Sequence, residues 1–291
     1  MNVAEQLVNQ LLDAGVRRIY GIVGDSLNPV VDAVRKTGGS AKGGIDWVHV
    51  RHEEAAAFAA AAEAQLTGEL AVCAGSCGPG NLHLINGLYD AQRSQAPVLA
   101  IASHIPSVQI GANYFQETHP DRLFLECSNY CELISTADQA PRVVNSAIRH
   151  AMANKSVSVV TLPGDITDQK ATAPTPLYVP FRRPVLAPNP EDVEQLTKLL
   201  NDARKIAIFA GAGVEGAHDE VLALADKLKA PIGHSLRGKD FIQYDNPFDV
   251  GMTGLLGFAS GYRAMEKCDA LLMIGTDFPY RQFFPAKAQI V

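Results

Sequence analysis

The sequence has only five cysteines, and their number does not suit a disulfide framework. An odd count in 291 residues cannot be fully paired, so we expect reduced thiols. Cys73 and Cys77 share their spacing with Cys127 and Cys131, which raises the alternative of a four-thiolate metal site. Structural zinc pairs usually have shorter or loop-borne spacings, and Cys73 lies in a predicted strand. We therefore predict no metal site.

The sequence also lacks a lysine or arginine cluster and an apolar run long enough to cross a membrane. Its formal net charge is -6, so a nucleic-acid partner is not expected. Its first residues do not form a basic segment followed by an apolar core, as a secretion signal would. The expected class is a cytoplasmic enzyme. His83, His104 and His119 do not have metal-ligand spacing, so structural or hydrogen-bonding roles are expected for them.

What the sequence does contain is a regular alternation of strand and helix patterns. At 291 residues and 47% hydrophobic, it is long enough for about two domains. Short apolar runs alternate with helical periodicity in the first half, which predicts a parallel sheet with helices on both faces. The predicted strands are residues 18–23, 47–50, 70–74, 98–102 and 157–162. The predicted helices are residues 3–14, 27–36 with Ser26 as N-cap, 53–67, a segment ending at Ala91, and 140–153.

Prolines recur between residues 169 and 190 without periodicity. Because proline fixes φ and has no N–H donor, we interpret this segment as a linker between domains 1–168 and 191–291. The second domain has predicted helices at 191–202 and 217–228 and strands at 205–210 and 270–274. The expected fold is therefore two parallel-sheet, three-layer α/β domains. Residues 287–291 read as the start of a strand, so we expect a truncated second domain belonging to a longer protein.

Glu53 is the most informative single residue, because it opens an alanine-rich helical segment. Small apolar neighbours disfavour a charged carboxylate, so Glu53 could share a proton with a basic ring nitrogen. Alternatively, Glu53 and Glu54 are helix N-terminal acids that complement the helix dipole.

Three turns follow predicted strands at the carboxyl edge of the first sheet, where open α/β folds bind ligands. Residues 76–81 read Ser-Cys-Gly-Pro-Gly-Asn and form either a ligand site or a tight turn. Residues 21–26 make a second such turn. Residues 114–119 either contact a substrate or anchor a loop. With Glu53 at the start of a neighbouring helix, these features are expected to converge.

In the second domain, a predicted strand precedes a G-x-G-x-x-G match at 211–216, which in that context suggests a dinucleotide. Residues 234–239 include no acidic residue for a ribose; Arg237 and Lys239 are compatible with phosphate instead. Glycine-bearing loops at 251–258 and 275–280 could wrap a long cofactor, or they are ordinary loops.

As a set, residues 51–81, the block 115–120 and the loops 251–258 and 275–280 resemble thiamine diphosphate-dependent enzymes, specifically quinone-reducing bacterial pyruvate oxidases. The resemblance covers essentially the whole chain, and several motifs recur in the acetolactate synthase group. It implies that residues 1–168 bind the pyrimidine of thiamine diphosphate and that the remainder is most of a central FAD-binding domain. The implied reaction is oxidative decarboxylation of pyruvate to acetate and carbon dioxide, with electrons passed through FAD to a quinone.

By this resemblance, Glu53 would hydrogen-bond the aminopyrimidine ring and favour its imino form, so that the cofactor removes its own thiazolium proton. The remaining thiamine and substrate contacts would come from three groups: Pro79, Gly80 and Asn81 at the pyrimidine, Gly24, Asp25 and Ser26 at the thiazolium, and Phe115 and Gln116 at the substrate. FAD would be held by Gly211, Ala212, Gly213, Val214, Arg237, Gly238, Lys239, Met252, Thr253, Gly254, Leu255, Gly275, Thr276, Asp277 and Phe278.

Members of this family have a third domain whose Gly-Asp-Gly to Asn motif binds the diphosphate through magnesium, and no such segment is found here. Magnesium ligands and any C-terminal membrane contact are therefore expected outside this sequence. The family's site forms between two subunits, so the chain is expected to hold half a site and the full-length protein to be a homodimer or homotetramer. The alternatives are an acetolactate synthase-like carboligase and a non-catalytic, truncated binding or assembly module.

Overall fold

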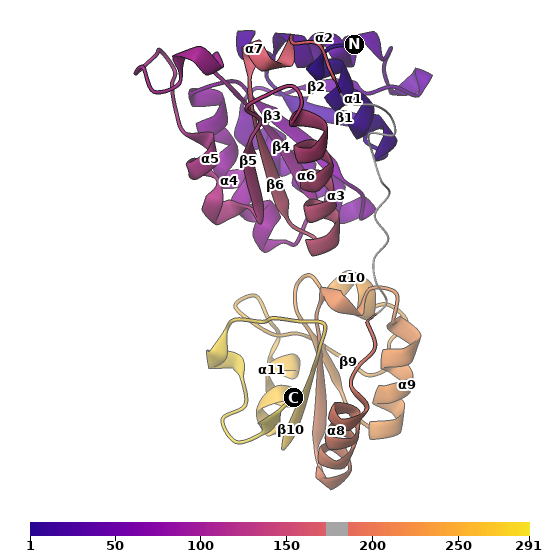
Figure 1. Cartoon of the computed structure of the whole chain (residues 1–291). Helices are drawn as coiled ribbons and strands as arrows, with labels where there is room; N and C mark the ends of the chain where they lie inside the picture. The colour runs from indigo at the N-terminus through magenta and orange to yellow at the C-terminus, as the bar shows by residue number, and fades with distance from the viewer. Residues whose placement is uncertain (173–185) are drawn as a thin grey trace. The chain divides into compact units, whose positions relative to one another are not determined.

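The computed structural model describes residues 1–172 and 186–291, which form two α/β units (Figure 1). The prediction of two parallel-sheet α/β domains is confirmed. Residues 173–185 of the predicted linker lie outside the described part of the chain. On either side of them, Lys170 forms an antiparallel bridge with Asn2, and helix α8 begins at Pro190. No described helix has the length and apolar character needed to cross a membrane.

The first unit is built on a six-stranded parallel sheet with the order β2-β1-β3-β4-β6-β5. The strand order changes direction between β1 and β3, and in open α/β sheets ligands bind at such a switch point, outside the carboxyl ends of the strands. The strands are β1 Arg18–Gly21, β2 Asp46–His49, β3 Ala71–Gly75, β4 Val98–His104, β5 Tyr130–Leu133 and β6 Val157–Pro163.

Helices cover both faces of this sheet because its buried strands present apolar side chains alternately to each side (Figure 1). Val72 and Ala74 of β3 pack with α1, α2 and α6, whereas Ala71 and Cys73 pack with α3 and α4. The helices are α1 Val3–Asp13, α2 Asn28–Lys36, α3 Glu53–Thr67, α4 Pro79–Arg93, α5 Pro120–Leu123, α6 Ala140–Asn154 and α7 Gly164–Thr167.

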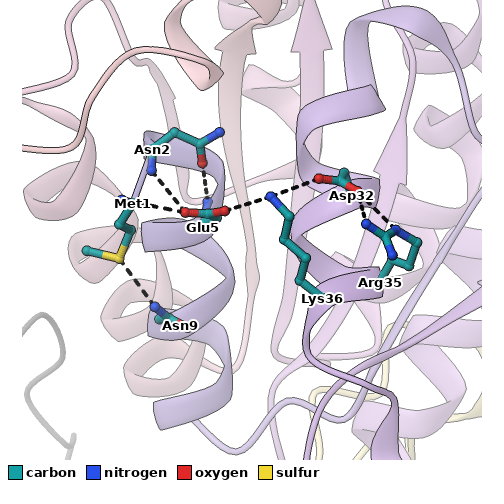
Figure 2. A network of polar contacts seen from close by, with 7 residues as sticks. All are labelled: Met1, Asn2, Glu5, Asn9, Asp32, Arg35 and Lys36. Atoms are coloured by element: carbon teal, nitrogen blue, oxygen red, sulfur yellow. Dashed lines mark hydrogen bonds and ion pairs between the residues drawn. The ribbon is translucent and has the colours of Figure 1, made fainter.

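A polar network ties the start of α1 to the end of α2 (Figure 2). Asn2 caps α1 by accepting a hydrogen bond from the backbone N–H of Glu5 at 2.9 Å, and Glu5 accepts one in return from the Asn2 backbone N–H. Lys36 Nζ lies 2.8 Å from one oxygen of Glu5 and 3.0 Å from Asp32. The hydrogen bond from Lys36 lowers the pKa of the Glu5 carboxyl. The charges on this face are therefore paired within the domain.

Helices α3 and α4 pack closely because their contact faces are built from small residues. The buried face of α3 is mostly alanine, and a Cβ on Gly87 of α4 would stand 2.5 Å from the Cβ of Ala57. Neither helix can move nearer, and any larger residue at position 87 would force them apart. This contact fixes the relative placement of the first turns of the two helices.

The second unit has a five-stranded parallel sheet with the order β11-β10-β7-β8-β9. Ile208 and Ala210 of β7 pack against the side that carries α8 and α9, and Ala207 and Phe209 face Met265 of α11 on the other side. The strands are β7 Ile206–Ala210, β8 Ile232–His234, β9 Asp249–Met252, β10 Ala270–Ile274 and β11 Gln289–Ile290. The helices are α8 Pro190–Asp202, α9 His218–Leu228, α10 Lys239–Ile242 and α11 Ala259–Lys267.

Two local predictions are wrong. Ser26 does not cap α2; it lies in the short 3-10 turn Asp25–Leu27, and its hydroxyl bonds to neighbouring loops instead. The segment 251–258 is not entirely a loop, because Gly251 and Met252 belong to β9. Gly251 has φ +87° and sits opposite a register shift in β8, so the pattern there does not alternate as a regular strand would.

Candidate active site

Three serines join the loops at the carboxyl ends of β1, β3 and β4. The Ser26 hydroxyl oxygen lies 3.0 Å from that of Ser76 and 2.6 Å from that of Ser103, and it accepts a hydrogen bond from the Cys77 backbone N–H at 3.0 Å. Gly24 makes the approach possible, because a Cβ there would collide with the Ser76 side chain. Two of the three predicted turns are therefore held together at the switch point of the sheet. Ser103 was not predicted, because it lies inside the apolar pattern of β4.

Glu53 is buried at the first position of α3, with only 6% of its surface exposed. Its Oε2 lies 2.9 Å from Nδ1 of His83, one turn into α4. A carboxylate at this helix end also benefits from the helix dipole, so both sequence interpretations of Glu53 are compatible with its position. Glu54 differs from it, because its carboxylate is partly exposed and bonds to Asn86.

The second carboxylate oxygen of Glu53 faces Gly80. A Cβ on Gly80 would come within 3.1 Å of Oε1, so glycine leaves this oxygen uncovered. Within the part of the chain that the structure describes, Oε1 has no hydrogen-bond partner. One oxygen is thus oriented by His83 while the other can accept a hydrogen bond from a ligand.

Pro79 and Asn81 fix the start of α4 beside this carboxylate. Pro79 is the first helical residue, where the missing N–H costs nothing. Asn81 is fully buried and donates a hydrogen bond from Nδ2 to the Ser103 carbonyl at 2.7 Å. Its Oδ1 is buried without a partner among the described residues. Asn81 therefore ties α4 to β4.

The third predicted turn also reaches this edge. A Cβ on Gly78 would stand 2.8 Å from the Cβ of Gln116, and the Cys77 thiol lies 3.6 Å from the Gln116 side-chain oxygen. Gln116 has φ +64° and Gly78 has φ +69°, so both are in the left-handed region where their loops meet. The Phe115 side chain is 81% exposed. This loop therefore presents Phe115 and Gln116 beside the 76–81 turn.

Of the other histidines named from the sequence, His104 is buried at the end of β4. Burial lowers the pKa of its imidazole, and its Nδ1 has no partner within residues 1–172 and 186–291. Asp25, by contrast, is exposed, and its carboxylate accepts a hydrogen bond from the Ser26 backbone N–H at 2.9 Å.

In the second unit, the loops after β7 and β10 cross at close range. The Gly211 N–H donates to Ile274 and the Gly213 N–H to Gly275, each at 2.9 Å. A Cβ on Gly213 would stand 2.6 Å from the Gly275 Cα, and one on Gly238 would stand 2.6 Å from the Ala210 carbonyl oxygen. Backbone packing thus accounts for these glycines without a ligand.

The remaining predicted FAD contacts lie at the same edge. Phe278 packs on Phe209 and Tyr280 with ring centroids 4.9 Å and 5.3 Å away, and Gly254 lies against the Phe278 ring. The Thr253 hydroxyl is buried and has no partner among the described residues. Ala212 and Val214 lie in a short 3-10 turn. The Thr276 hydroxyl accepts a hydrogen bond from the Phe278 backbone N–H. The exposed residues of this set are Arg237, Lys239, Leu255 and Asp277.

Comparisons with known proteins agree with this arrangement of domains. Residues 1–123 match the family described as thiamine pyrophosphate enzyme, N-terminal TPP binding domain, and residues 193–291 match the thiamine pyrophosphate enzyme, central domain. The chain belongs to the thiamine pyrophosphate enzyme family. Within this family, the convergence of the β1 and β3 loops around Glu53 lies in the part matched by the N-terminal TPP binding domain.

Relatives of this thiamine pyrophosphate enzyme differ in their named activities. An uncharacterized 42.6 kDa protein of Pseudomonas amyloderamosa is 59% identical over 99% of this chain and 72% of its own length. Pyruvate oxidase of Lactiplantibacillus plantarum is 33% identical over 96% of this chain and 46% of its own length. The acetolactate synthase isozyme 2 large subunit of Escherichia coli is 33% identical over 97% of this chain and 50% of its own length. The chain thus spans about half the length of the two enzymes with named activities.

Proposed function

We propose that this chain forms the pyrimidine-binding and central parts of a thiamine diphosphate- and FAD-dependent pyruvate oxidase. The reaction is oxidative decarboxylation of pyruvate to acetate and carbon dioxide, with a quinone as electron acceptor. The observation that carries the proposal is the environment of Glu53: a buried carboxylate with one oxygen bonded to His83 and the other left open by Gly80.

The residues around Glu53 suit an aminopyrimidine ring. Its open oxygen can hold a ring proton, while His83 keeps the carboxylate oriented and Gly80 provides the space in front of it. Thiamine diphosphate, when bound, supplies the electron sink for decarboxylation of a keto acid. Pro79, Gly80 and Asn81 would hold the pyrimidine, and the turn from Gly24 to Ser26 would lie near the thiazolium.

The substrate would lie beside Phe115 and Gln116, because their loop docks on the 76–81 turn. The exposed Phe115 ring offers an apolar contact and Gln116 a hydrogen bond to a carboxylate or carbonyl. FAD would be held at the carboxyl edge of the second sheet, where the unpaired Thr253 hydroxyl fits a hydrogen-bonding ligand. Magnesium ligands and the quinone contact are proposed for residues outside this chain, in a cytoplasmic homodimer or homotetramer.

The test compares Glu53→Gln with Glu54→Gln in the protein that carries this chain, supplied with pyruvate, thiamine diphosphate, magnesium, FAD and a quinone. Proton handling by a side chain typically contributes at least about a hundredfold, so we expect Glu53→Gln to lose that much turnover while FAD stays bound. Glu54→Gln is the matched control and should turn over normally, since its carboxylate bonds to Asn86. Near-normal turnover of Glu53→Gln would contradict the proposal.

Acetolactate synthesis is the second candidate, because the pyruvate oxidase and the acetolactate synthase above are equally similar to the chain, at 33% identity. The product separates the two. Acetate formed together with reduction of a quinone or dye supports the oxidase, and acetolactate formed without an acceptor supports the synthase. Absence of any turnover with all cofactors present would favour a non-catalytic binding or assembly module.

A further inference from the structure

Two histidines lie against Glu53, and the proposed function gives His52 no chemical role. His52 precedes α3 and His83 lies in α4; their rings stack with centroids 4.2 Å apart and an interplanar angle of 26°. Each of the three residues offers a ligand atom, and these atoms all lie within 4.8 Å of one another. Among residues 1–172 and 186–291, no other group of three histidine, cysteine or acidic side chains is arranged in this way.

The donor set suits a transition metal. Two imidazole nitrogens and one carboxylate oxygen are ligands of zinc and related divalent ions, with metal–ligand distances of about 2.0–2.2 Å. Two atoms bound to one such ion therefore lie no more than about 4.4 Å apart. In the structure the three ligand atoms lie within 4.8 Å of one another, only slightly more than this limit. The His52 and His83 side chains are 50% and 43% exposed, so their rings have room to turn.

We propose that His52, Glu53 and His83 bind one divalent transition-metal ion of the zinc class, with a remaining position open to solvent. The ion takes the place of the hydrogen bond between His83 Nδ1 and Glu53 Oε2, which lie 2.9 Å apart. The sequence spacing gives no sign of this site, because residues 52 and 83 meet only through the packing of α3 on α4.

The metal also competes with the cap of α3. His52 Nδ1 accepts a hydrogen bond from the Glu54 backbone N–H at 3.2 Å. If the ion binds Nδ1, it takes that lone pair; if it binds Nε2, a neutral ring carries its proton on Nδ1 and can no longer accept. In both cases the Glu54 amide loses its partner. Metal binding is therefore expected to accelerate hydrogen exchange at Glu54.

An ion bound at this site would prevent Glu53 from contacting thiamine diphosphate. This consequence rests on the proposed function; the binding of the metal does not. The ion and the aminopyrimidine require the same carboxylate. Zinc should therefore inhibit pyruvate turnover, and added thiamine diphosphate should relieve the inhibition.

The direct test is calorimetric titration of the metal-stripped chain with Zn²⁺ alone, with the absorption spectrum of Co²⁺ as a second readout of coordination. One ion per chain is expected. Glu53→Gln and His83→Gln should each weaken binding at least about tenfold, the smallest loss caused by removing even an outer-sphere partner of a metal ligand. Glu54→Gln and His150→Gln, which alter a neighbouring carboxylate and an exposed histidine of α6, are the matched controls and should bind normally.

Absence of saturable binding, or binding unchanged in both ligand variants, overturns the site. Exchange at the Glu54 amide of the unmutated chain tests it without any variant: unaltered exchange at saturating zinc also overturns it. Zinc that binds without competing with thiamine diphosphate contradicts the role proposed for Glu53 in thiamine binding and leaves the metal site standing.

Discussion

Ala57 and Gly87 meet with no space between them for one further carbon, since a Cβ on Gly87 would lie 2.5 Å from the Ala57 Cβ. Glu53 and His83 each stand four residues earlier on the same helices, and therefore on the same faces. The alanine-rich face of α3 thus sets the distance at which the carboxylate of Glu53 meets the imidazole of His83, 2.9 Å. A packing contact in the core thus positions the buried carboxylate of Glu53 against the partly exposed imidazole of His83.

Gly87→Ala should destabilise the first domain. Overpacking of a core costs about 1–3 kcal/mol, partly offset by about 1 kcal/mol of improved helix propensity, so we expect a net loss of up to about 2 kcal/mol. The single tryptophan, Trp47 of β2, packs against the core of the first domain on the side of α1, α2 and α6. Its fluorescence during urea unfolding therefore reports on this domain alone.

The control for Gly87→Ala is Gly43→Ala. Gly43 has φ +81° but no atom within 4 Å of an added Cβ, so its substitution reports backbone strain without a clash. If Gly87→Ala is as stable as the unmutated chain, the close packing of α3 on α4 is not the constraint inferred here.

Gly80→Ala should weaken thiamine diphosphate binding without unfolding the domain. The new methyl group would stand 3.1 Å from Glu53 Oε1 and cover the oxygen proposed to accept the ligand's hydrogen bond. Loss of a hydrogen bond to a charged group corresponds to a decrease in affinity of about tenfold to a hundredfold. Calorimetric titration measures this, and unchanged affinity would show that Oε1 does not face the ligand.

Ser26→Ala should loosen the junction of the loops after β1, β3 and β4. One hydroxyl contacts Ser76, Ser103 and the Cys77 N–H, and its removal leaves buried polar groups unsatisfied at a cost of about 1–3 kcal/mol. Ser128→Ala, which removes a single bond to the Phe124 carbonyl, is the comparison and should cost less. Equal losses in the two variants would argue against a shared role for Ser26.

The stability of the second domain should decrease as the pH rises through the folded-state pKa of His218. Asp219, followed by the Tyr244 carbonyl, raises the pKa of His218 above its usual value of 6.5. A raised folded-state pKa means that the stabilisation is complete below 6.5 and is lost as the pH rises through the folded value. Imidazole NMR titration should show His218 titrating above 6.5, and Asp219→Asn should bring it back toward that value. Identical titration curves for the two proteins would exclude this pair as the cause.

Three thiols should resist alkylation in the folded chain at neutral pH. Burial raises the pKa of Cys73 to about 12, that of Cys127 to about 11 and that of Cys131 to about 12. Because the thiolate is the reactive form, iodoacetamide should label these residues only after unfolding in urea. Peptide mapping measures the labelling, and rapid modification of native Cys73 would show that the β3 core opens.

The sequence was sufficient to predict features that depend on a single helix or strand. It was insufficient for contacts between residues of two different elements. Glu53 could be selected from the alanine run that follows it, because helix periodicity places those alanines on a buried face. His83 is 30 residues away, and its contact with Glu53 depends on the packing of α3 on α4. The signal in the sequence that could have indicated this contact is that Glu53 precedes Ala57 by the same number of residues as His83 precedes Gly87.

The same distinction applies to the fold. Strands β3 and β4 are continuous apolar runs and were predicted within a few residues. Strand β5 includes the exposed Glu132, and β8 has only three residues, so neither gives a pattern of its own. Both exist because a neighbouring strand supplies their hydrogen bonds. Their positions are set by the sheet and not by their own composition.

The bridge between Asn2 and Lys170 has a consequence for the order of synthesis. The Val3 N–H donates to the Gln169 carbonyl, and the Ala171 N–H donates to that of Met1, so the first residues of the domain are held by its last. On the ribosome, α1 leaves the exit tunnel before the rest of this domain but cannot acquire these partners until residue 171 has also left it. The backbone hydrogen bonds that hold Met1 and Val3 therefore form only after almost all of the domain has been synthesised.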